Sequence, residues 1–250
     1  MMAHEAATLV PPDPPNGVLA HLGLAGCIRL PMRIDAAAFA AELAALPADV
    51  WSGAGRDPVV QAAVESSFAV GHPRSAKPLP PEDRPPLARL PGLRRFVRET
   101  VPAIPNRVIV TRLAAGGMIS LHTDTPRFFR STVRLSIQID AAGPQRLSSD
   151  GLWYAMAPGE VWALDNLRRH GVLNAGETPR IAVLADFRPT DELLRLVLAG
   201  ETGLGIRDEK ATRELEERSR ERYRRERWKA LRYEASKWLT RRRAQLGLRR

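Results

Sequence analysis

A histidine and an aspartate stand two residues apart in the stretch LHTDTPRFF, at His122 and Asp124. In an extended strand, residues two apart share one face, so both side chains are expected to point the same way. The pair offers a divalent metal ion one neutral nitrogen ligand and one anionic oxygen ligand. A polar loop without a metal is the alternative interpretation, because two ligands alone hold a divalent ion poorly.

A third candidate ligand, His170, follows Asp124 after 46 residues, where a turn in the stretch DNLRRHGVLNAG enters another strand-like run. Two histidines and one carboxylate on one side of an iron ion form the facial arrangement of non-haem Fe(II) oxygenases, which leaves coordination positions open for O₂ and a cosubstrate. Zinc is usually satisfied by four ligands and does not need that vacancy. The pattern therefore predicts an Fe(II) site formed by His122, Asp124 and His170.

The cosubstrate of such oxygenases is 2-oxoglutarate, whose distal carboxylate needs a cation. Arg180 stands ten residues after His170, at the start of the run RIAVLADF. A guanidinium matches a carboxylate bidentately and stays charged when it is buried. In the run VRLSIQI, alternation places Arg134 and Ser136 on one face, which is either solvated or directed into a barrel that holds an anionic ligand. We favour the inward direction, because it supplies Arg134 and Ser136 to the same pocket.

The elements that position these residues are expected to be strands. Short runs of alternating character follow Pro105, separated by glycine and proline turns, and they leave little room for helices. This texture predicts a mainly β, jelly-roll-like architecture. The expected strands are RVIVTRL, MISLHTD, TVRLSIQID, LWYAMA, EVWALD, GVLNA and RIAVLADF.

Helices are expected on both sides of this core. The run DAAAFAAELAAL, from Asp35, has good helix formers and an acidic cap, and LRRFVRETV is interpreted as a short helix. Residues 71–92 contain too many prolines for a central strand and are expected to form an ordered surface loop. We therefore expect a flexible N-terminus at residues 1–17, one domain at 18–190 with its jelly-roll core at about 105–190, and a basic helical extension at 191–250.

The formal net charge of +10 is unevenly distributed along the chain. Residues 207–250 contain 17 Lys and Arg against 8 Asp and Glu, a net charge of +9, which leaves +1 for residues 1–206. Any argument from charge to a polyanionic partner therefore concerns the tail alone.

The tail is expected to form one long helix with an imperfect apolar stripe, made of Leu215, Trp228, Leu231, Ala235, Trp238 and Leu246. Three interpretations are open: docking on the body through Trp228, Leu231 and Trp238, formation of a homodimer, or binding of an acidic partner such as RNA or a leader peptide. Acidic residues often precede basic ones by three or four positions, which is typical of a self-stabilised, solvated helix. This pairing favours docking or dimerisation over nucleic acid.

The compartment follows from what the sequence lacks. The single cysteine, Cys27, cannot form an intramolecular disulfide, and the amino terminus has neither the basic start nor the apolar run of a secretory signal. No stretch reaches the roughly 18 uninterrupted apolar residues of a membrane span. We expect a cytoplasmic protein without a membrane partner.

The run from Gly117 to Phe187 resembles the aspartyl/asparaginyl β-hydroxylase family, which includes bacterial cis-4-proline hydroxylases. The resemblance is carried by GMISLHTD, TVRLSIQID and MAPGEVWALDNLRRHGVLNAGETPRIAVLADF, and upstream runs extend it to roughly residues 25–190. It implies a double-stranded β-helix of the cupin-like jelly-roll type that uses Fe(II), 2-oxoglutarate and O₂. Residue by residue, it implies His122, Asp124 and His170 as iron ligands and Arg180 as the partner of the distal carboxylate.

Two departures from the animal members of the family bear on the site. Animal aspartyl hydroxylases have glycine at the position of Asp124, so this chain is more similar to members with a complete triad. They also carry histidine where this chain has Ser136, close to the cosubstrate. Asn166 and Asn174 match positions that often carry asparagine, for which a turn-forming role is an alternative to binding.

The expected function is that of a 2-oxoglutarate-dependent dioxygenase that hydroxylates an unactivated C–H bond of an amino acid, free or within a peptide or protein. The alternative is a non-catalytic jelly-roll module whose basic helix binds RNA or an acidic peptide. A zinc hydrolase on the same three ligands lacks an obvious additional general base. Arg127 and Arg130 are candidates for a substrate carboxylate or are surface charges, whereas the aromatic residues Trp153, Tyr154 and Trp162 are expected to pack.

Overall fold

The computed structural model describes residues 14, 16–53, 63–71, 82–124, 127–140 and 145–245. Most of the predicted flexible N-terminus and residues 72–81 of the predicted surface loop at 71–92 lie outside the described residues. The described end of that loop is instead helical, because it contains the short helix Pro85–Ala88 and the start of the helix Pro91–Arg95, each with a proline in its first turn. None of the helices in the described part of the chain is long and apolar enough to span a membrane.

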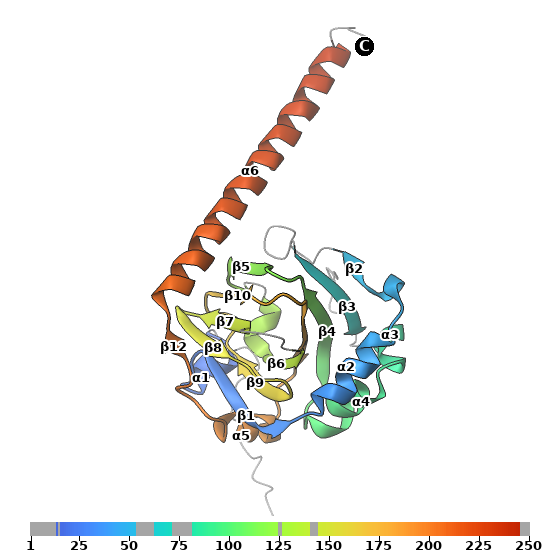
Figure 1. Cartoon of the computed structure of the whole chain (residues 1–250), viewed down its shortest axis with the longest axis vertical. Helices are drawn as coiled ribbons and strands as arrows, with labels where there is room; N and C mark the ends of the chain where they lie inside the picture. The colour runs from blue at the N-terminus through green and yellow to red at the C-terminus, as the bar shows by residue number, and fades with distance from the viewer. Residues whose placement is uncertain are drawn as a thin grey trace, which may run out of the picture.

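Two antiparallel sheets form the body of the molecule and face each other across its interior (Figure 1). The large sheet has the order β1-β9-β6-β11-β4-β3-β2 and the small sheet the order β12-β8-β7-β10-β5. This arrangement confirms the predicted mainly β, jelly-roll-like core. The strands are β1 Cys27–Arg33, β2 Ser52–Gly53, β3 Val64–Val70, β4 Pro105–Leu113, β5 Met118–His122, β6 Val133–Asp140, β7 Gln145–Ser149, β8 Leu152–Ala155, β9 Glu160–Leu164, β10 His170–Asn174, β11 Arg180–Phe187 and β12 Ile206–Arg207.

All seven strands that the sequence predicts are present, and others were not predicted. Among the latter, β1 and β3 lie upstream of Pro105 but belong to the large sheet, so the sheet begins before the predicted core at about 105–190. Pro31 obscures β1 in the sequence, and it is tolerated because β1 is an edge strand. β7 was missed because its sequence, QRLSS, is largely polar.

The large sheet has an apolar outer face and an inner face that carries polar side chains. On β6, Val133, Leu135 and Ile137 belong to the buried cluster that includes residues of the covering helices. Arg134 and Ser136 line the interior pocket instead. The inward direction favoured for the polar face of this strand is therefore correct, and burial of the opposite face against helices drives it.

Short helices cover the outer face of the large sheet (Figure 1). The predicted helix after Asp35 is α2, whose N-terminus is capped by the Asp35 side chain, which accepts a hydrogen bond from the Ala38 backbone N–H at 3.0 Å. The predicted helix in LRRFVRETV is α4 followed by a π-helical turn. The helices are α1 Val18–His21, α2 Ala36–Ala44, α3 Pro85–Ala88, α4 Pro91–Arg95, the π-helical turn Phe96–Thr100, α5 Asp191–Leu198 and α6 Glu209–Gln245, with 3₁₀ turns at Ala48–Val50 and Arg127–Ser131.

The tail forms one long helix, α6, as predicted, and it extends away from the barrel in Figure 1. Among its described side chains, residues 209–228, the buried ones lie in the first turns, at Ala211, Leu215 and Ser219. Trp228 is 67% exposed, so the predicted docking through this residue is wrong, and Leu231 and Trp238 lie outside the described side chains. The helix docks through small and aliphatic residues that precede the aromatic part of its stripe.

The aromatic residues Trp153, Tyr154 and Trp162 are buried, which confirms that they pack. Tyr154 and Trp162 meet edge to face in the apolar cluster inside the barrel, with ring centroids 6.1 Å apart. This cluster fills one part of the interior and leaves the remainder for a polar pocket.

Candidate metal centre and cosubstrate pocket

Neighbouring strands bring the two histidines together. β5 and β10 pair in antiparallel fashion with His122 directly opposite His170, and the ring centroids are 4.2 Å apart. Asp124 follows the end of β5, and its backbone N–H donates a hydrogen bond to the Asn166 carbonyl at 3.0 Å. The Asp124 Oδ1 atom lies 3.9 Å from Nε2 of His122. Three residues that are remote in the sequence therefore line one pocket.

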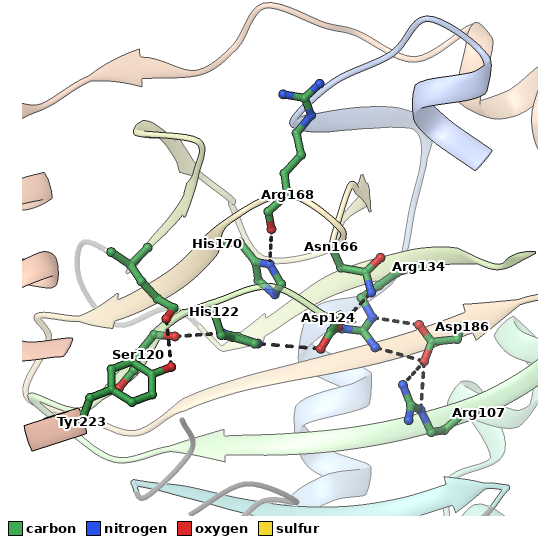
Figure 2. A network of polar contacts seen from close by, with 11 residues as sticks. Arg107, Ser120, His122, Asp124, Arg134, Asn166, Arg168, His170, Asp186 and Tyr223 are labelled. Carbon is green, nitrogen blue, oxygen red and sulfur yellow. Dashed lines mark hydrogen bonds and ion pairs between the residues drawn. The ribbon is translucent and has the colours of Figure 1, made fainter. Parts of the chain in front are cut away.

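Each histidine ring is oriented by a backbone carbonyl (Figure 2). Nδ1 of His122 is 2.8 Å from the Ser120 carbonyl, and Nδ1 of His170 is 2.8 Å from the Arg168 carbonyl. A carbonyl oxygen only accepts hydrogen bonds, so both neutral rings carry their proton on Nδ1. Their Nε2 atoms keep the lone pair that a metal ion needs.

His170 is held in its neutral form. Burial lowers its pKa to about 4, and the neighbouring His122 acts in the same direction. A neutral imidazole at pH 7 binds a metal ion without first having to lose a proton.

One carboxylate oxygen of Asp124 is engaged in hydrogen bonds with neighbouring side chains. Its Oδ2 atom accepts hydrogen bonds from Nη1 of Arg134 at 2.7 Å and from Nδ2 of Asn166 at 2.8 Å. Burial alone raises the pKa of this carboxyl, but Arg134, helped by His170 and Asn166, outweighs burial and lowers it to about 2. The carboxylate is therefore ionised, and Oδ1 is the oxygen directed towards His122.

No three His, Cys, Asp or Glu side chains in the described ranges stand in ready-made metal-binding spacing. Neighbouring ligands at right angles, about 2.1 Å from an ion, are about 3 Å apart, whereas Oδ1 of Asp124 is 3.9 Å from Nε2 of His122. The donor set nevertheless fits Fe(II), because it combines two imidazole lone pairs with one anionic oxygen in a shared pocket.

A buried ion network holds Arg134 behind Asp124 (Figure 2). Asp186 on β11 lies directly opposite Arg134 on β6 and Arg107 on β4. It accepts hydrogen bonds from Nε of Arg134 at 2.8 Å and from Nε and Nη2 of Arg107 at 2.9 and 2.6 Å. The carboxyl is 1% exposed, and its pKa lies below its ordinary value, because the two guanidinium groups outweigh burial. The positive charges of two arginines are thus compensated by the negative charges of two aspartates inside the barrel.

Arg134 is occupied by these carboxylates. Its Nη1 atom donates a hydrogen bond to Asp124, while Nε and Nη2 donate hydrogen bonds to Asp186. The guanidinium also lies 4.7 Å from the ring centroid of Phe129. Direct contact of Arg134 with the cosubstrate stays a prediction, and the contacts present orient Asp124.

Arg180 is a buried cation whose charge is not matched by a carboxylate among the described residues. It is 6% exposed, and its Nε atom donates a hydrogen bond to Oε1 of Gln138 at 2.9 Å. Burial alone lowers its pKa to about 10. A buried cation without a partner is costly, so the site is suited to an anionic ligand.

Ser136 adds a hydroxyl group to the same pocket. Its Oγ atom is buried and has no hydrogen-bond partner among the described residues. Ser136 and Arg180 both line the pocket that also contains His122, Asp124 and His170. A buried hydroxyl without a partner and a buried cation in one pocket suit a polar, anionic ligand.

The two asparagines differ in role. Asn166 contacts the candidate ligand Asp124, whereas Nδ2 of Asn174 donates to the backbone carbonyls of Leu113, Ala114 and Thr178. Asn174 therefore stabilises turns. Arg130 is exposed and the side chain of Arg127 lies outside the described residues, so their contact with a substrate stays a prediction.

Sequence reasoning missed several polar residues of the interior, among them Arg107, Asp186 and Ser149. Asp186 is in phase with Arg180 along β11, so the alternation that selected Arg180 also pointed to it. Ser149 lies opposite His170 on β7, and its buried Oγ atom has no hydrogen-bond partner among the described residues. No signal in the sequence identified Ser149, because β7 itself was not predicted.

Comparisons with known proteins agree with this fold. Residues 83–189 match the family described as aspartyl/asparaginyl β-hydroxylase. An oxidoreductase of the 2OG-Fe(II) oxygenase family from Burkholderia pseudomallei is similar over 71% of this chain and 94% of its own, with 17% identity and a TM-score of 0.50. At this identity, the likeness shows a shared fold.

Two further structures are more distant. A prolyl hydroxylase from Trichoplax adhaerens, solved with a peptide of hypoxia inducible factor, covers 75% of this chain and 92% of its own at 12% identity and a TM-score of 0.43. A cupin domain from Bordetella pertussis covers 35% and 94%, at 18% identity and a TM-score of 0.28. No curated protein matches the chain.

Proposed function

We propose that the chain is an Fe(II)- and 2-oxoglutarate-dependent dioxygenase, and the match of residues 83–189 to the aspartyl/asparaginyl β-hydroxylase family supports this. Its substrate is an amino acid, free or within a peptide or protein, that is hydroxylated at an unactivated C–H bond. The observation that carries the proposal is the buried, unmatched cation of Arg180 in the pocket that also contains His122, Asp124 and His170. One pocket thus offers both a set of metal donors and a place for a distant carboxylate.

One group of residues binds the metal ion and another binds the cosubstrate. Nε2 of His122, Nε2 of His170 and Oδ1 of Asp124 would hold Fe(II). When bound, Fe(II) together with 2-oxoglutarate and O₂ supplies the oxidising power that replaces a C–H bond by C–OH. The guanidinium of Arg180 and the hydroxyl of Ser136 bind the distal carboxylate, which fixes the orientation of the cosubstrate.

The remaining polar residues keep the donors in place. The Ser120 and Arg168 carbonyls hold the two rings with Nε2 directed away from the backbone. Arg134 and Asn166 restrain Oδ2 of Asp124, so that the other oxygen is available. The apolar side chains of Ile119, Leu147 and Val172 form part of the pocket wall and exclude water from it. No side chain has to act as a general base for the C–H step.

The test is to measure binding and turnover separately. Anaerobic titration with Fe(II) and 2-oxoglutarate should give saturable binding of both. Succinate assays over a panel of amino acids and peptides should then identify at least one substrate that stimulates succinate formation. A protein that binds neither Fe(II) nor 2-oxoglutarate contradicts the proposal, and binding without any succinate favours the non-catalytic module.

The partner of α6 stays a prediction. Its exposed ion pairs at i,i+4 spacing, between Glu214 and Arg218 and between Glu221 and Arg225, favour a self-stabilised helix over one whose basic residues await nucleic acid. The cytoplasmic location likewise stays a prediction from the sequence.

A further inference from the structure

The strand that carries His122 lies at the edge of its sheet. β5 is the last strand of the five-stranded sheet and pairs only with β10 among the described strands. An edge strand exposes backbone N–H and C=O groups, which must be covered if the strand is to keep a fixed position. The first turns of α6 pack against β5 and provide this cover.

Side chains of α6 take up the backbone groups of β5 at the residue next to the candidate ligand. The Leu121 N–H donates a hydrogen bond to Oγ of Ser219 at 3.0 Å, and the hydroxyl of Tyr223 donates to the Leu121 carbonyl at 3.1 Å. Two arginines add similar bonds nearby: Arg222 donates to the Met118 carbonyl at 3.3 Å and Arg218 to the Gly116 carbonyl at 2.8 Å. Both polar groups of the Leu121 backbone are thereby fixed, directly before His122.

The same helix packs on the strand that carries His170. A Cβ atom added to Gly171 would lie 3.1 Å from Cδ2 of Leu215, a side chain that is 1% exposed. The helix therefore lies against the β10 backbone at the residue that follows His170. On the other side of His170, Arg169 forms an ion pair with Glu216 at 3.4 Å, which is solvent-exposed and contributes little.

We propose that the first turns of α6, residues 211–223, are a positioning element of the metal centre. The helix holds the backbones of β5 and β10 beside both histidines and so sets the spacing of their Nε2 atoms. Ser219 and Tyr223 are the positioning residues, because they act on His122 through Leu121. This part of the C-terminal extension then belongs to the catalytic unit. This inference rests on the proposed iron site, but the clamp on Leu121 can be tested without iron.

The experiment compares the full-length double variant Ser219→Ala/Tyr223→Phe with a matched control, Thr212→Val. Thr212 lies on the same helix and accepts a hydrogen bond from Nε1 of Trp153 at 2.9 Å, so its loss also weakens the docking of α6. Within the described part of the chain, the hydroxyl of Thr212 bonds to Trp153 and to the Asp208 carbonyl, and to no backbone group of β5 or β10. Any effect of loosened docking as such should therefore appear in both proteins.

Two measurements are needed. Hydrogen exchange of the metal-free proteins should show at least tenfold faster exchange within residues 118–124 in the double variant, and no such change in the control. Anaerobic titration, followed by the visible charge-transfer absorbance of Fe(II) with 2-oxoglutarate, should show iron binding weakened about tenfold, as is typical when supporting residues of a metal site are removed. The position of the absorbance band should also shift, which a general loss of stability does not cause.

The outcomes separate the two hypotheses. Equal exchange and equal iron affinity in the double variant and the control overturn the positioning role. A wild-type chain that binds no iron overturns the proposed function, while the exchange measurement still decides whether α6 clamps Leu121. If the double variant does not fold, Tyr223→Phe alone gives the answer, because it removes one hydroxyl from a partly exposed ring.

Discussion

At the scale of single residues, the site depends on which atom of each side chain is engaged by the protein. Nδ1 of His122 and Nδ1 of His170 each donate a hydrogen bond to a backbone carbonyl. Oδ2 of Asp124 accepts hydrogen bonds from Arg134 and Asn166. The spacing of these residues in the sequence was sufficient to select them. It did not reveal which oxygen of Asp124 is free, because that depends on Arg134 and Asn166, which come from other strands and loops.

Replacement of His122 or His170 by alanine should abolish 2-oxoglutarate turnover. Each change removes one of only three donors, and the remaining two hold a divalent ion poorly. We expect succinate formation to fall at least a hundredfold, while the circular dichroism spectrum is unchanged. Retention of more than a tenth of the wild-type rate in either variant would mean that the replaced histidine is not an iron ligand.

Arg180→Ala should mainly raise the concentration of 2-oxoglutarate that is required. Loss of a charged hydrogen bond costs about 1.5–3 kcal/mol, which corresponds to a roughly tenfold to hundredfold higher KM for the cosubstrate. Iron binding in the absence of 2-oxoglutarate should change little, and this serves as the internal control. A near-wild-type KM would mean that the distal carboxylate binds elsewhere.

Asp186→Asn should destabilise the fold, because it leaves Arg107 and Arg134 buried beside a neutral group. We expect the free energy of unfolding at pH 7 to fall by about 3 kcal/mol in urea denaturation. Asp83→Asn is the control, since its partner Arg98 is solvent-exposed and the pair should contribute less than about 1 kcal/mol. Equal effects of the two substitutions would argue against the network.

The pH dependence of this difference has a defined sign. The pKa of Asp186 in the folded protein lies below its ordinary value of 3.8. Its contribution to stability is therefore present above pH 3.8 and is lost as the pH falls through the lower, folded-state pKa. The gap between wild type and Asp186→Asn should narrow in acid, and a gap that widens there would contradict the assigned charge state.

At the scale of elements, pairing between strands decides which side chains meet. The sequence predicted the strands of the core and their inward faces, because alternation in runs such as VRLSIQI and RIAVLADF is strong. It did not predict that Asp186 would stand between Arg107 and Arg134, since only the register of β4, β6 and β11 shows this. The docking interpretation of the tail, one of three, relied on Trp228, Leu231 and Trp238, because large aromatic and aliphatic residues are stronger hydrophobic signals than Ser219.

The contact between α6 and β10 can be tested with a pair of substitutions. Gly171→Ala places a methyl group 3.0 Å from the Ile119 carbonyl and 3.1 Å from Leu215, so it should be destabilising by about 1–3 kcal/mol. Leu215→Ala should cost about 2–5 kcal/mol. The double variant should lose less free energy of unfolding than the sum of the two single losses, because the smaller side chain at position 215 leaves room for the methyl group at position 171. Strictly additive losses in urea denaturation would mean that the two residues do not touch.

At the scale of the whole molecule, α6 has two parts with different surroundings. Its first turns are attached to the barrel as far as Tyr223, whereas Trp228 is exposed and the helix continues away from the body (Figure 1). The sequence predicted one basic helix but not this division, because charge and helix propensity are similar along its length.

Truncation after Arg227 should leave the metal centre intact. The contacts of α6 with β5 and β10 precede this residue. We expect the melting temperature to stay within a few degrees of that of the full chain. The affinities for Fe(II) and for 2-oxoglutarate should each change less than about twofold. Sedimentation velocity of both proteins reveals whether residues 228–250 form a homodimer, and a loss of iron binding on truncation would contradict the division.

The opposition of His122 and His170 across one strand pair has a consequence for how the protein can diversify. Their separation in space depends on the pairing of β5 with β10 and on the helix that packs against both strands, whereas the 47 residues between them in the sequence do not determine it. Turns in that interval can lengthen, shorten or change composition while the imidazoles keep their places. Selectivity for different substrates can therefore evolve in the connecting segments without rebuilding the reactive centre.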